Sequence, residues 1–174
     1  MLALTLALLQ QAPSDLAADF ELPEGLAVTL WAETPQLFNP TAMDVDAQGR
    51  VWVTEAVNYR RWDGRNPGFT REGGDRVVIL EDTDGDGRCD SSKVFAQDPE
   101  LVAPLGICVL GERVLVSCSP SILEFQDRNG DGDALDPGEK SVFLTGFGGH
   151  DHDHGVHSLV KGPDGRLYFT TGNA

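Results

Sequence analysis

Three copies of a strand–turn–strand pattern constrain the fold of this chain more than any other feature. The copies are AMDVDAQGRVWVTE at 42–55, GICVLGERVLVSC at 106–118 and SLVKGPDGRLYFTT at 158–171. Each has an apolar segment, a tight turn with Gly near an arginine (Arg50, Arg113 or Arg166), and a second segment that alternates apolar and polar residues. A period of two is typical of β-strands, and Gly supplies the positive φ that such turns need. The repeat therefore predicts three β-hairpins.

Two further strands follow each of the first two hairpins. RVVILED and KVFAQ flank one Asp-rich turn, and SILEFQD and KSVFLTGF flank another, without helical periodicity. Repeats of four antiparallel strands are typical of β-propellers. We therefore expect an all-β chain that forms a β-propeller fragment of about two and a half four-stranded antiparallel blades. Blade one is expected at about 41–97, blade two at about 102–145, and the start of blade three at about 154–174.

A single strand, LAVTLWAE at 26–33, is expected before the first blade. In a propeller such a strand completes the last blade and closes the ring, which removes exposed sheet edges. Because propellers need roughly four to eight blades, residues 19–174 are expected to be the N-terminal part of a larger propeller. Residues 59–75, rich in Gly and Arg, form an insertion in blade one. Such an insertion is either a functional loop or an irregular connection.

The N-terminal segment and the net charge bear on localisation and partners. MLALTLALLQQA resembles the apolar and cleavage regions of a secretory signal peptide, although it lacks the usual Lys or Arg. Residues 1–18 are therefore expected to be a signal peptide and linker, and the protein to be exported to the periplasm or cell envelope; a frayed helix is the alternative. The net charge of −15 argues against nucleic acid and anionic membrane as partners, while peripheral association with a membrane by other means is left open.

Three cysteines, Cys89, Cys108 and Cys118, cannot all pair within the chain. A hairpin centred on the turn at 111–112 sets Cys108 opposite Leu115, so a disulfide to Cys118 would need an irregular turn. Buried free thiols are the expected state. The sequence contains no C-x-x-C-H motif and hence no attachment site for haem c.

Two Asp-rich turns, DTDGDGRCD and DRNGDGDALD, match the opening of a calcium-binding loop. Alternate oxygen-bearing side chains converge on one hard cation there, and Gly permits the sharp bend. Neither turn has the bidentate Glu of an EF-hand, because Lys93 and Gly138 occupy that position. The turns are therefore expected to hold structural calcium weakly, or to be Asx-rich turns without an ion. The candidate ligands are Asp82, Asp84, Asp86 and Asp90 in the first turn, and Asp127, Asn129, Asp131, Asp133 and Asp136 in the second.

All four histidines lie in GGHDHDHGVHS at 148–158. In an extended strand, residues 150, 152 and 154 would project to one face and could bind a transition metal. The flanking glycines instead favour a loop, either simply solvated or carrying a general base. The position of the cluster favours a base or a substrate-binding group, because it precedes the innermost strand of a blade. Propeller ligands bind at the mouth of the channel that such strands surround.

The stretch HGVHSLVKGPDGRLYFTTGN resembles soluble quinoprotein glucose/sorbosone dehydrogenases, in which a His five residues before a Leu precedes a G-P-D-x-x-[LI]-Y strand. His154 stands five residues before Leu159 and matches that histidine. The resemblance implies that His154 is the catalytic base beside pyrroloquinoline quinone, with His157 or Asp153 holding its imidazole.

Most of the chain is similar to membrane-bound dehydrogenases of planctomycete type. The resemblance rests on LPEGLAVTLWAETPQLFNPTAMDVDAQGRVWVTEAVNYR, RVVILEDTDGDGRCDSSKVFAQ and LTGFGGHDHDHGVHSLVKGPDGRLYF. It implies a propeller that oxidises a sugar or other polyol and passes electrons to a haem c domain beyond these residues. The family's E-x-x-N-Y segment falls on Glu55, Asn58 and Tyr59, followed by Arg60, and implies cofactor-binding residues at the same mouth.

Two functions of other classes fit the same residues. A non-enzymatic calcium-binding propeller could bind glycans or proteins through its Asp-rich turns. A metal-dependent hydrolase could use the histidines as ligands.

Overall fold

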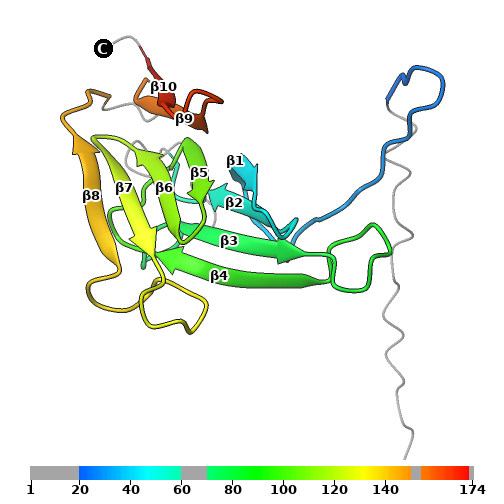
Figure 1. Ribbon diagram of the computed structural model, residues 1–174, viewed down its shortest axis with the longest axis horizontal. Coiled ribbons are helices and arrows are strands. Elements are labelled where there is room, and N and C mark those ends of the chain that lie inside the picture. The colour runs from blue at the N-terminus through cyan, green and yellow to red at the C-terminus, as the bar shows by residue number, and fades with distance from the viewer. Residues whose placement is uncertain (1–19, 60–69, 150–153, 173–174) are drawn as a thin grey trace, which may run out of the picture. The chain divides into compact units, whose positions relative to one another are not determined.

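The computed structural model describes residues 20–59, 70–149 and 154–172. Over these residues ten strands form three antiparallel sheets of four, four and two strands, with no helix (Figure 1). The expectation of an all-β chain is confirmed. Since the described residues form no helix, no helix among them could cross a membrane.

The strands follow chain order in each sheet. Sheet 1 contains β1 (Pro40–Val45), β2 (Val51–Glu55), β3 (Arg76–Glu81) and β4 (Ser91–Gln97). Sheet 2 contains β5 (Gly106–Leu110), β6 (Arg113–Cys118), β7 (Ser121–Gln126) and β8 (Lys140–Thr145). Sheet 3 contains β9 (Val156–Lys161) and β10 (Leu167–Thr171).

The chain divides into two compact units, one up to Trp31 and the other Ala32–Ala174. The expected strand at 26–33 falls across this division, and the structure shows no strand there. That prediction was wrong. An extended segment becomes a strand only when a neighbouring strand supplies its ladder hydrogen bonds, and none of the ten described strands pairs with this segment.

The three predicted hairpins are confirmed in register and in turn conformation. Cys108 lies opposite Leu115, as the turn length predicts. In the β1–β2 and β9–β10 turns, Gly49 and Gly165 take φ of 84° and 80°. The amide of each Gly donates to the carbonyl three residues earlier at 3.0 Å. The two turns are therefore the same structure built from different residues.

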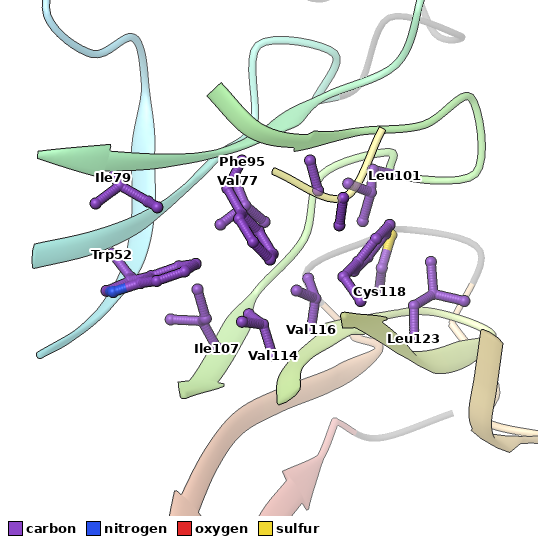
Figure 2. Packing of buried hydrophobic residues seen from close by; sticks show 13 residues of the cluster. Trp52, Val77, Ile79, Phe95, Leu101, Ile107, Val114, Val116, Cys118 and Leu123 are labelled. Carbon is purple, nitrogen blue, oxygen red and sulfur yellow. The ribbon is translucent and has the colours of Figure 1, made fainter. Parts of the chain in front are cut away.

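Sheet 2 buries side chains on both of its faces. Val114 and Val116 of β6 pack into a cluster with Trp52 and Phe95 of sheet 1, where the two aromatic rings meet edge to face at 4.7 Å (Figure 2). Leu115, between the two valines, points to the other face and packs with sheet 3. Full burial of each such side chain stabilises the fold by roughly 1.5–3 kcal/mol. Sheet 2 thus lies between its two neighbours.

The first strands of the three sheets lie side by side, β5 between β1 and β9. The backbone amide of Val109 in β5 donates to Oδ2 of Asp44 in β1 at 2.7 Å. On the other side of β5, the amide of Ser158 in β9 donates to the carbonyl of Leu105 at 3.2 Å. Three successive sheets are therefore stacked face to face, with their first strands in contact.

All three cysteines are buried and free, so the expectation of free thiols is confirmed. Burial raises the pKa of the Cys118 thiol to about 12.

Candidate functional site

His154 is exposed in the turn that leads into β9. The turn is held on both sides. The amide of Gly172 donates to the carbonyl of Gly155 at 2.8 Å, and the amide of Val156 donates to Oγ of Ser119 at 2.9 Å. A Cβ at residue 172 would lie 2.6 Å from the His154 backbone. Glycine at 172 therefore lets the end of β10 approach the histidine turn closely.

His157 lies in β9, half-buried and opposite Thr170. Asp153 and the other two histidines of the cluster, His150 and His152, lie outside the described residues. The catalytic roles of His154, His157 and Asp153 stay predictions.

A hollow of about 440 Å³ lies between the first strands of the three sheets. It is lined by Met43 and Asp44 of β1, Cys108 of β5 and Lys161 of β9, among others. The lining residues lie in the middle and later parts of these strands, whereas His154 precedes the start of β9. His154 is not among the residues that line the hollow.

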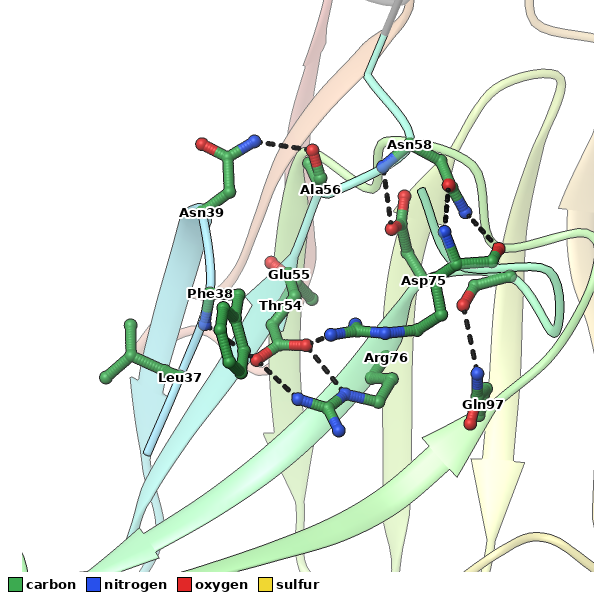
Figure 3. Close-up of polar contacts among 12 residues, drawn as sticks. Leu37, Phe38, Asn39, Thr54, Glu55, Ala56, Asn58, Asp75, Arg76 and Gln97 are labelled. Atoms are coloured by element: carbon green, nitrogen blue, oxygen red, sulfur yellow. Dashed lines mark hydrogen bonds and ion pairs between the residues drawn. The ribbon is translucent and has the colours of Figure 1, made fainter. Parts of the chain in front are cut away.

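Glu55, at the end of β2, is fully buried and binds two arginines, Arg71 and Arg76 (Figure 3). Together with the Phe38 amide these three residues form what we call the hub. Oε2 of Glu55 accepts from Nη1 of Arg71 at 2.5 Å and from Nε of Arg76 at 2.7 Å. Its Oε1 accepts from Nη2 of Arg76 and from the backbone amide of Phe38, both at 2.9 Å. Both guanidinium groups also lie over the Phe38 ring, at 5.9 and 6.0 Å. Both carboxylate oxygens are thus engaged by the chain itself.

Asn58 is also fully buried and joins the two ends of the insertion. Its amide nitrogen donates to the carbonyl of Arg71, and its Oδ1 accepts from the Arg71 backbone amide, both at 2.9 Å. Its own backbone amide donates to Asp75 at 3.0 Å, and Asp75 also accepts from Ala103 at 2.7 Å. Burial raises the pKa of Asp75, against the lowering effect of these hydrogen bonds.

The E-x-x-N-Y segment therefore anchors the base of the insertion. Tyr59 is half-buried beside Asn58, and Arg60 lies outside the described residues. Direct cofactor binding by Glu55, Asn58, Tyr59 and Arg60 stays a prediction. Sequence reasoning missed the partner Asp75 and the two hub arginines, because their pairing depends on how β3 meets β2.

The first Asp-rich turn, between β3 and β4, gathers three carboxylates. One oxygen each from Asp82, Asp84 and Asp86 lie within 4.8 Å of one another. Asp82 accepts from the amides of Gly85 at 2.7 Å and Gly87 at 2.9 Å. The hydrogen bond from Gly87, with others from the turn, lowers the pKa of Asp82. The three carboxylates thus lie close together, and the backbone amides of the turn stabilise the charged form of Asp82.

Asp90, the fourth candidate ligand of this turn, does not belong to this group of three. Both of its oxygens accept from the backbone amide and hydroxyl of Thr83, at 2.8 to 3.2 Å. A hard cation bound at Asp82, Asp84 and Asp86 would therefore need water or backbone oxygen for its remaining positions.

The second turn, between β7 and β8, repeats the backbone pattern of the first. Asp127 accepts from Gly130 at 2.6 Å and from Gly132 at 2.8 Å, as Asp82 does from Gly85 and Gly87. Its other side chains are arranged differently: Asn129 donates its amide to Asp131 at 2.9 Å and to Asp136 at 2.7 Å. Among the described residues, only the first turn forms a group of three carboxylates suited to a metal ion.

Stacked antiparallel sheets with an acidic turn at the outer hairpin of two of them define an all-β protein with a candidate metal centre. The family model described as a domain of unknown function, DUF7133, matches residues 12–174, and the chain belongs to this family. No curated protein matches the chain.

One solved structure is similar, the calcium structure of a Trichoderma reesei carbohydrate-active enzyme of family AA12. The sequences are 14% identical and the TM-score is 0.45, over 72% of this chain and 27% of that one. The chain thus spans about a quarter of the length of that structure.

Proposed function

We propose that the chain is the N-terminal part of an exported β-propeller that oxidises an alcohol group of a sugar or polyol. The observation that carries the proposal is the contact of β5 with β1 on one side and β9 on the other, in three sheets stacked face to face. Sheets that fan around an axis place their first strands together in this way. The exposed His154 at the entry to β9 then lies beside one mouth of the central channel.

In this proposal His154 is the general base. An imidazole titrates near neutral pH, so it can accept the proton of the substrate hydroxyl. The carbon that bears this hydroxyl loses its hydrogen as hydride in the same step. Pyrroloquinoline quinone, when bound, supplies the hydride acceptor. In this proposal a haem c domain outside this sequence would accept the electrons.

Among the described candidates for catalysis and cofactor binding, His154 alone is exposed, so it is the residue that could face such a cofactor. Glu55 and Asn58 are fully buried and their polar groups are engaged within the chain. Their part in the proposal is to fix the base of the insertion beside the mouth. His157 and Asp153 would orient the His154 imidazole.

Dye reduction by the full-length protein tests the proposal. A panel of sugars and polyols is supplied with pyrroloquinoline quinone, calcium and an artificial electron acceptor. His154→Ala is expected to lower the rate at least about 100-fold, the usual contribution of a general base. Arg166→Gln, in the exposed β9–β10 turn, is the matched control and should retain the rate. Equal rates in wild type and His154→Ala would remove His154 from the chemistry.

We also propose structural calcium in the first Asp-rich turn, at Asp82, Asp84 and Asp86. The support is the convergence of their oxygens, the ligand type that calcium prefers. Metal analysis of the purified protein should find calcium and little zinc. Stoichiometric zinc would favour the hydrolase alternative. Calcium-dependent binding to glycans, without dye reduction on any alcohol, would favour the adhesive one.

A further inference from the structure

The second Asp-rich turn already contains a cation, supplied by the neighbouring sheet. Nζ of Lys93, in β4 of sheet 1, donates to the backbone carbonyl of Asp131 at 3.0 Å. The same ammonium lies 3.6 Å from Oδ2 of Asp133. A Cβ at Gly132 would stand 2.7 Å from Nζ, so glycine at this position leaves the space that the ammonium occupies.

The packing of the turn against β4 fixes this arrangement. The backbone amide of Ala134 donates to the carbonyl of Phe95 in β4 at 2.7 Å. Ala134 is buried and belongs to the core cluster that sheets 1 and 2 share. The turn is therefore docked on the outer strand of sheet 1 two residues from Lys93, which places the ammonium beside the Asp131 carbonyl and the Asp133 carboxylate.

Other carboxylates of this turn accept hydrogen bonds from a side-chain amide. The Asn129 amide bridges Asp131 and Asp136, so two like charges share one neutral donor group. In the first turn the corresponding residue is Asp84, which has a carboxyl group in place of the Asn129 amide and so no NH₂ group to donate; like Asn129, it accepts from the backbone amide two residues later. The two turns thus share a backbone but differ in how their charge is balanced.

We infer that the Lys93 ammonium takes the place of a divalent cation in the second turn, so that the first turn alone holds calcium. Lys93 is also the residue that stands where an EF-hand-like first turn would have its bidentate Glu. Lys93 therefore weakens metal binding in the first turn, where it replaces a ligand, and excludes a metal ion from the second turn, where its ammonium lies. By strand register the corresponding residue of β8 is Ser141, which carries no charge. The statement about the first turn rests on the calcium site proposed above, whereas the statement about Lys93 does not.

Calcium titration of the full-length protein, freed of metal by chelation and followed by calorimetry, tests the inference. Lys93→Gln keeps a hydrogen-bond donor but removes the charge, and Lys93 is half-exposed, so the variant should fold. Its circular dichroism spectrum checks this. It is expected to bind one more calcium ion than wild type. Adding Asp131→Asn should abolish the extra site, and Lys161→Gln, which removes a positive charge elsewhere, should not create one.

Each outcome decides one statement. The inference about Lys93 is overturned if Lys93→Gln binds the same number of calcium ions as wild type. It is also overturned if Lys161→Gln gains a calcium ion as Lys93→Gln does, or if the extra site persists when Asp131→Asn is added. Asp84→Asn is expected to lower the wild-type number by one. If it does not, the calcium site of the first turn is refuted, while a gain in Lys93→Gln still supports the role of the ammonium.

Discussion

Replacement of Glu55 by Ala should strongly destabilise the protein, because it leaves two arginines without their shared carboxylate. The hub contains three hydrogen bonds between charged groups, at 2.5, 2.7 and 2.9 Å, and one from the Phe38 amide. The Glu55 side chain is 0% exposed, and those of Arg71 and Arg76 are 11% and 19% exposed. Removing one partner of a buried ion pair costs about 3–5 kcal/mol. The partial exposure of the arginines favours the lower half of that range.

Urea unfolding and thermal melting of the purified protein measure this loss. At about 2–4 °C for each kcal/mol, a loss of about 3–4 kcal/mol should lower the melting temperature by about 6–16 °C. Glu100→Gln is the control, because the Glu100 side chain, which pairs with Lys140, is 64% exposed. Exposed pairs contribute about 0–1 kcal/mol. The control should therefore change the melting temperature by only a few degrees.

The result also separates two roles for Glu55. A loss below about 1 kcal/mol would refute the buried hub, since such a value is that of a solvated pair. If, in addition, dye reduction fell without a loss of stability, Glu55 would act on the cofactor rather than on the fold. A large loss of stability supports the anchoring role derived from the structure.

Three further predictions follow from single groups. Burial raises the pKa of Asp46, but hydrogen bonds from Trp52 and Arg50 outweigh it and lower the pKa overall. The contribution of the Asp46 carboxylate to the free energy of unfolding should therefore be present above about pH 4 and fade as the pH falls further. In urea titrations, Asp46→Asn should lower that free energy by about 1.5–3 kcal/mol at pH 7 and by less at pH 2. At pH 8 the Cys118 thiol, with a pKa of about 12, should resist thiol reagents until the protein unfolds, as peptide mapping can verify. Calcium chelation should lower the melting temperature of wild type but not of Asp84→Asn; equal shifts would place the calcium elsewhere.

The strand and turn pattern of the chain was largely predictable from sequence, because its causes are local. The alternation in β6 reports directly that Val114 and Val116 share one face and Leu115 the other. Glycine at turn positions 49 and 165 predicts a positive φ there, and the structure confirms it. The strand expected at 26–33 failed for the converse reason, since a strand also needs a partner that local sequence does not specify.

The candidate site was predictable only in its residue types. The Asp-rich turns were correctly located, yet the sequence treats them as near copies. Their difference arises because Lys93 reaches the second turn from a strand of the neighbouring sheet. Likewise Glu55 was selected for its motif, while its burial depends on Arg71 and Arg76 arriving from the next strand and its preceding loop.

The sequence by itself determined an all-β chain of repeated hairpins with acidic outer turns, since side-chain alternation and turn glycines act over a few residues. Only the tertiary structure decided which charges meet. Ion pairs and metal sites require atoms within a few ångströms, and here that proximity comes from the face-to-face stacking of sheets whose contacting residues are far apart in the chain.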